Sequence, residues 1–203
     1  MVYRLALWCA RKAVDNSAAR SAWQLLPDLA FLISVLAGIY HFGIDVDALS
    51  FVLISLATIL ICVTDFKWLT VPDRVTLPLL AAGLLISGAS TRFQPVDAVI
   101  GAAVGLVIMY SIGWVGSAAF GREALGGGDI KLTAALGSFV GWQGVIGTIL
   151  LGSVLALLYV VVFRLLARKG SALRIVPLGP FLGFAALVTG TWMNLIGAHI
   201  LRI

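Results

Sequence analysis

The stretch VDAVIGAAVGLVIMYSIGWVGSAA, residues 96–119, contains a single charged side chain, Asp97, next to its beginning. An α-helix needs about 20 predominantly apolar residues to cross the roughly 30 Å hydrocarbon core of a bilayer. This stretch meets that length, and its only charge lies where a helix would enter the membrane. Residues 96–119 therefore predict a transmembrane helix.

The composition of the whole chain agrees with this prediction. Of the 203 residues, 61% are hydrophobic and 11% are charged, whereas a soluble domain carries about 25% charged residues. Alternation of polar and apolar residues, which a membrane β-barrel requires, is missing. We therefore expect an all-α polytopic membrane protein, a bundle of about six to seven transmembrane helices. Its other apolar runs cover residues 26–43, 48–64, 75–90, 130–141, 144–166 and 177–200.

One run is too short to cross a membrane alone. Residues 130–141 would rise about 18 Å as an α-helix, at 1.5 Å per residue. Asp129 immediately precedes this run. Irregular backbone and charge at membrane depth are tolerated where protein or a water-filled cavity surrounds them. We therefore expect Asp129 to lie below the membrane surface, in such a cavity.

The distribution of basic residues predicts the orientation. With the N-terminus in the cytoplasm, every Lys and Arg except Arg92 and Arg202 falls on the cytoplasmic side, as the positive-inside rule requires. This rule also accounts for the formal net charge of +5. No exposed domain is available for a basic nucleic-acid surface, so nucleic acid is not an expected partner. We expect the outer surface of the helix bundle to contact the lipid bilayer.

The chain divides into two expected regions. Residues 1–47 combine an amphipathic N-terminal segment, which lies on the membrane surface, with one accessory membrane helix. Residues 48–203 form the main membrane domain. The two cysteines, Cys9 and Cys62, form no C-x-x-C pair, and neither a metal site nor a cofactor is expected.

Two carboxylates stand out against this apolar background. Asp65 follows the apolar residues 60–64, and Asp129 follows Gly126, Gly127 and Gly128. Carboxylates in membrane helices are costly and often functional, and glycines let another backbone, such as an extended substrate, approach closely. Taken singly, Asp65 also fits an interfacial carboxylate beside Lys67. Asp129 also fits a helix cap in a glycine-rich turn.

As a pair, the two aspartates suggest hydrolysis. Carboxyl groups that lie close together can share one proton, so that one removes a proton from water while the other protonates a peptide carbonyl. This chemistry needs neither a metal nor a covalent intermediate. The alternative is a small proton- or cation-coupled transporter that uses intramembrane aspartates. Transporter sites more often lie at mid-membrane between repeated halves, and no repeat is visible here.

The segments around both aspartates resemble a known family. Residues 126–129 match the G-x-G-D signature of membrane aspartic peptidases. The stretch DFKWLTVPDRVT, residues 65–76, and the stretch GDIKLTAALG, residues 128–137, together resemble the type IV prepilin leader peptidases. Residues 177–180, PLGP, look like the P-x-G-P segment of that family. The resemblance extends over about residues 48–190.

This resemblance implies a specific activity. It implies an aspartic endopeptidase of the bacterial inner membrane that removes the short basic leader from prepilins or pseudopilins at the cytoplasmic face. Asp65 and Asp129 would be its catalytic pair, facing one another, and a pilus or secretion assembly machine would be a further partner. The residues expected to support the site or the approach of substrate are Pro72, Asp73, Gly126, Gly127, Gly128, Lys131, Pro177, Gly179 and Pro180.

Two supporting residues have narrower expected roles. Asp73 would stabilise the turn at Val71 and Pro72 without acting as a catalyst. Lys131 would either adjust the proton affinity of Asp129 by its positive charge or serve only as an interfacial lysine.

The chain departs from the common bacterial pattern at its N-terminus. Common members carry paired C-x-x-C motifs there, which are associated with N-methylation of the trimmed pilin. Residues 1–47 contain one cysteine. We therefore expect a peptidase without methyltransferase activity.

Overall fold

A computed structural model describes residues 36, 40, 46–68, 70–90, 94–166 and 177–200. The amphipathic segment and almost all of the accessory helix expected within residues 1–47 lie outside the described residues, as do residues 167–176. The described residues form helices and contain no strand. The five helices are α3 (Val46–Trp68), α4 (Asp73–Ser87), α5 (Pro95–Phe120), α6 (Gly127–Leu166) and α7 (Gly179–Ile200).

The helices expected within the described residues are present, and the all-helical fold is confirmed. The apolar runs 48–64, 75–90, 96–119 and 177–200 each coincide with one helix to within a few residues. Within the described part of the chain, α3, α5 and α6 are long and apolar enough to cross a membrane. The larger expected number of crossings, and the side of the membrane on which each loop lies, stay predictions.

Asp97, the only charged residue of the stretch 96–119, caps the beginning of helix α5. Asp97 lies in its first turn and accepts a hydrogen bond of 3.1 Å from the backbone N–H of Gln94. Gln94 in turn caps the backbone of Asp97, which completes a capping box, and Pro95 begins the helix. The helix ends at Gly121, whose φ of 65° is left-handed. Asp97 therefore provides a hydrogen-bond acceptor for a free N–H group at the start of the helix, where a negative charge is favourable.

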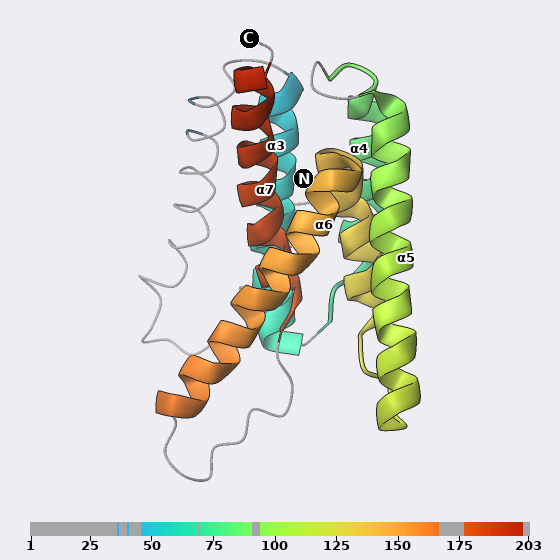
Figure 1. Ribbon diagram of the computed structural model, residues 1–203, viewed down its shortest axis with the longest axis vertical. Coiled ribbons are helices and arrows are strands. Elements are labelled where there is room, and N and C mark those ends of the chain that lie inside the picture. The colour runs from blue at the N-terminus through green and yellow to red at the C-terminus, as the bar shows by residue number, and fades with distance from the viewer. Residues whose placement is uncertain are drawn as a thin grey trace, which may run out of the picture.

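Helix α6 consists of two arms that meet at Gly141. The backbone leaves helical geometry there, with φ 70° and ψ 179°, so the two runs predicted at 130–141 and 144–166 correspond to its arms. In Figure 1 the second arm (orange) turns back from the top of the first arm and descends obliquely. A side chain at Gly105 of α5 would contact both the Thr133 carbonyl of the first arm, at 2.8 Å, and Val145 of the second, at 3.0 Å.

Helices α5 and α6 approach backbone to backbone. A Cβ atom at Gly101 would overlap the carbonyl oxygen of Gly137, and one at Gly137 would overlap that of Gly101. Small residues permit this kind of contact between membrane helices, where packing and interhelical hydrogen bonds drive association. The first arm of α6 is thereby held against α5 along its length.

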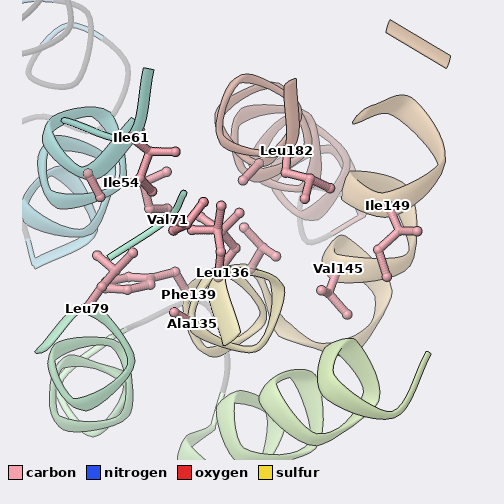
Figure 2. Close-up of a cluster of buried hydrophobic side chains, with 14 of the residues drawn as sticks. Ile54, Ile61, Val71, Leu79, Ala135, Leu136, Phe139, Val145, Ile149 and Leu182 are labelled. Carbon is pink, nitrogen blue, oxygen red and sulfur yellow. The ribbon is translucent and has the colours of Figure 1, made fainter. Parts of the chain in front are cut away.

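Helix α6 lies at the centre of the bundle. It packs against α4, α5 and α7, and α3 packs against α4 and α7. The core between them contains side chains from all five helices and from the connection between α3 and α4. Figure 2 shows Val71 of that connection between Ile61 of α3 and Leu136 of α6. Val71 is thus part of the core, and it lies between α3, which carries Asp65, and α4.

Candidate active site

Asp65 lies near the C-terminal end of α3, and its side chain points into the bundle. The residue is only 5% exposed. Its Oδ2 accepts a hydrogen bond of 3.1 Å from the backbone N–H of Gly179, the first residue of α7. A buried carboxylate requires such a partner, because removing it from water without one is costly. The bond fixes the orientation of the Asp65 carboxyl group.

The sequence around Gly179 makes its N–H available to Asp65. Pro180 has no N–H, and the N–H groups of Phe181 and Leu182 both donate to the carbonyl of Leu178. The N–H of Gly179 is free of intrahelical bonds because it begins the helix. A Cβ atom at Gly179 would lie 2.6 Å from Ile61 Cγ2 and 3.1 Å from Asp65 Oδ2. Glycine is therefore required for this approach.

Asp129 lies in the first turn of α6, as its position after three glycines predicts. Its backbone N–H donates to the carbonyl of Gly126 at 3.1 Å. Its Oδ1 is buried and has no hydrogen-bond partner within the described part of the molecule. The carboxyl group is near enough to Asp65 for the two to interact electrostatically. The structure thus brings together the two aspartates selected from the sequence.

Val71 fills the space between the segments that carry these aspartates. A Cβ atom at Gly128, next to Asp129, would lie 2.9 Å from both the Cβ and the carbonyl oxygen of Val71. Val71 Cγ2 would lie 3.3 Å from a Cβ atom at Gly179. A backbone does approach the glycine run closely, as expected, but at Gly128 it is the chain's own. The space at Gly127 is open, and Gly126 has only Asp129 within 4 Å.

The side chain of Lys131 forms an ion pair with Asp73. Its Nζ contacts both carboxyl oxygens of Asp73, at 2.8 and 2.7 Å. Residues two apart on a helix do not face each other, so Lys131 and Asp129 point to different sides of α6. The expectation that Lys131 acts directly on Asp129 finds no contact to support it. Asp73, the first residue of α4, is its partner.

Comparison with known proteins identifies the family of the chain. The sequence model of the type IV leader peptidase family matches residues 51–161 of this chain. The chain belongs to this family. The match begins in α3 and ends in the second arm of α6, so it includes both aspartates of the leader peptidase motif pair.

The curated relatives are longer than this chain. A prepilin leader peptidase/N-methyltransferase of Stutzerimonas stutzeri is 32% identical over 198 residues, which cover 96% of this chain and 68% of the relative. The Pseudomonas putida protein of the same name is 33% identical, over 81% of this chain and 57% of its own length. The Klebsiella pneumoniae protein is 44% identical, over 50% of this chain and 44% of its own length. No solved structure matches the chain significantly.

The proline residues expected to support the leader peptidase site mark the ends of helices. Pro72 precedes α4 in extended geometry, with φ −75° and ψ 135°. Its carbonyl accepts the N–H groups of Val75 and Thr76, at 2.9 and 3.3 Å. Pro177 and Pro180 flank the N-terminus of α7, and both are buried. Pro72 and Pro177 thus lie just before α4 and α7, and Pro180 lies in the first turn of α7.

In the described residues, no three His, Cys, Asp or Glu side chains come together in a way that would hold a metal.

Val71 lies against both Gly128 and Gly179, but the sequence did not identify it as a site residue. The available signal was an apolar side chain directly before Pro72, in a connection between two helices, where polar residues are more usual.

Proposed function

We propose that this protein is an aspartic endopeptidase that cleaves the leader from type IV prepilins or prepilin-like precursors, with Asp65 and Asp129 as its catalytic pair. One observation carries the proposal. Two carboxyl groups from distant parts of the chain come together at one end of the bundle: one is held by the N–H of Gly179, and the other has a buried oxygen with no hydrogen-bond partner among the described residues. Unpaired buried oxygens are rare, and a catalytic role is one of the reasons that proteins retain them.

In the proposed reaction, one carboxyl group acts on a water molecule and the other acts on the scissile peptide bond. One carboxylate removes a proton from water as the water oxygen attacks the carbonyl carbon of the scissile peptide bond. The other carboxyl group donates its proton to the carbonyl oxygen. Collapse of the resulting tetrahedral diol breaks the C–N bond, and the leaving amine takes up a proton. Each turnover consumes one water molecule and returns the pair to its shared single proton.

The substrate class comes from the relatives and the side of the membrane from the charge pattern. The curated relatives are named prepilin leader peptidases, which supports a prepilin or pseudopilin precursor as substrate. Arg74, Arg122 and Lys131 lie around the end of the bundle that carries the aspartates. Basic residues favour the cytoplasmic side, so we place cleavage at the cytoplasmic face of the bacterial inner membrane. A pilus or secretion assembly machine is a proposed further partner.

Neither the family nor the relatives support the transporter alternative. The relatives are also named N-methyltransferases, but this chain contains only Cys9 and Cys62, and two cysteines so far apart form no C-x-x-C pair. We therefore propose leader cleavage without methylation for this chain.

The deciding experiment is a cleavage assay of the purified full chain in liposomes, with a prepilin from the same genome. Asp65→Asn and Asp129→Asn should each lower the rate by about 10²- to 10⁴-fold or more, because one carboxyl group cannot fill both proton-transfer roles. Asp73→Asn should lower the rate far less than either of these changes, because its carboxyl group takes no part in proton transfer. With a methyl donor present, the product mass, read by mass spectrometry, locates the cut and reveals any added methyl group.

The outcomes separate the parts of the proposal. Normal cleavage by folded Asp65→Asn or Asp129→Asn protein would exclude the catalytic pair. A product heavier by one methyl group would contradict the proposed lack of methylation. Failure of the folded wild type on several prepilins and pseudopilins would exclude the substrate class.

A further inference from the structure

The Asp73–Lys131 ion pair joins two segments that belong to different halves of the site. Asp73 is the first residue of α4, and it directly follows Val71 and Pro72 of the connection from α3. Asp65 lies near the end of α3. Lys131 follows Asp129 in the first arm of α6. Both side chains are about half exposed, at 53% and 47%. Both lysine contacts are short, so the pair has the geometry of a two-point attachment.

The pair lies directly beside the contact of Val71 with Gly128. Val71 is buried, at 6% exposed, and its carbonyl oxygen and Cβ both press against the Gly128 position. On its other side Val71 meets Gly179, whose N–H holds Asp65. A displacement of the connection would therefore move Val71, and with it the spacing between the segments that carry Asp65 and Asp129.

We propose that Asp73 and Lys131 are positioning residues. Their ion pair fastens the α3–α4 connection to the first turn of α6, keeps Val71 seated between Gly128 and Gly179, and thereby sets where Asp129 lies relative to Asp65. This inference rests on the proposed peptidase function. It assigns to Lys131 a role through Asp73 and Val71, in place of a direct effect of its charge on Asp129.

The size of the expected effect follows from the exposure of the pair. Exposed ion pairs contribute about 0.2–1 kcal/mol, which corresponds to a loss of up to about fivefold in rate. Asp73→Asn and Lys131→Gln should each lower kcat about two- to fivefold and leave KM unchanged, because the alignment of the carboxyl groups matters in the transition state. In the wild type, salt at about 1 M should lower kcat towards the value of the variants, because salt screens exposed charges.

The decisive variant exchanges the two charges. Asp73→Lys combined with Lys131→Asp should recover most of the kcat that either charge reversal alone removes, since the attachment is rebuilt with opposite polarity. Arg74→Gln is the matched control: it removes an exposed positive charge from the neighbouring residue of α4, and kcat should not change. If Lys131 acted on Asp129 by its own charge, the exchanged variant would be about as impaired as Lys131→Asp alone, and the proposal would be overturned.

A second measurement separates this inference from the proposed function. The thermal unfolding midpoints of Asp73→Asn, Lys131→Gln and the double variant measure how much the ion pair stabilises the protein. This measurement needs no substrate. Both single variants should lower the midpoint, and the double variant should lower it no further than either. That result, together with a wild type that does not cut prepilins, would exclude the proposed function and leave the pair intact. Additive losses in the double variant would overturn the pair itself.

Discussion

At the scale of single residues, the three glycines before Asp129 are not equivalent. Gly128 is in contact with the backbone and side chain of Val71, whereas the space around Gly127 is open. Gly128→Ala should therefore force Val71 and the α6 terminus apart. Overpacking of this kind costs about 1–3 kcal/mol, and a displacement of about 1 Å in a site can lower a rate about 10²-fold. The measurement is kcat for the purified variant on a prepilin.

Gly127→Ala is the matched comparison for this variant. It adds the same methyl group one residue earlier on the same helix, into open space, and alanine favours helix over glycine by about 1 kcal/mol. Its loss of activity should be far smaller than that of Gly128→Ala. Equal losses from the two variants would mean that the contact with Val71 is not what makes glycine necessary at position 128.

At the scale of helices, the reversal of α6 depends on the backbone of one residue. Gly141 has φ 70° and ψ 179°, a region that is essentially restricted to glycine. An added Cβ would meet nothing within 4 Å, so substitution tests the backbone alone. Gly141→Ala should lower the free energy of unfolding by about 1–3 kcal/mol. The shift is measurable by thermal or denaturant unfolding in detergent.

Gly88→Ala provides the control for backbone strain. Gly88 follows α4 with φ −67° and ψ −21°, which any residue adopts, and an added Cβ would make only an ordinary 3.5 Å contact with the Leu85 carbonyl. Its unfolding free energy should change by less than about 0.5 kcal/mol. If both alanine variants unfold alike, the reversal at Gly141 does not need a left-handed residue.

At the scale of the whole molecule, the alternating direction of the helices gathers the site. The end of α3 and the beginnings of α4, α6 and α7 lie at one end of the bundle, and the beginning of α5 lies at the other (Figure 1). The charge pattern predicts that the site end faces the cytoplasm. In a variant without Cys9 and Cys62, a cysteine at Glu123 should react with a membrane-impermeant maleimide only after the membrane is opened.

A cysteine at Ala89 gives the opposite expectation. Ala89 is exposed and follows α4 at the far end of the bundle, so it should be labelled in intact spheroplasts. Labelling of Glu123→Cys and protection of Ala89→Cys in intact cells would place the aspartates on the outer side. The proposed cleavage at the cytoplasmic face would then be wrong, although the catalytic pair would not be affected.

The amino-acid sequence was enough to predict the membrane class, the helices of the described residues and the two candidate aspartates. Apolar runs such as 96–119 are long and nearly free of charge, and a bilayer tolerates little else than helices from such runs. Asp65 and Asp129 were visible for the same reason, since a carboxylate beside an apolar run is costly unless it has a use.

The tertiary structure alone decided which groups serve each aspartate. The N–H of Gly179 reaches Asp65, Val71 occupies the space at Gly128, and Lys131 pairs with Asp73. None of these pairings is local in the sequence, and the periodicity of a run reports which face of a helix is apolar but not which residue of another helix meets it. That choice depends on how side-chain shapes fill the bundle, and shape complementarity exists only once the helices have packed.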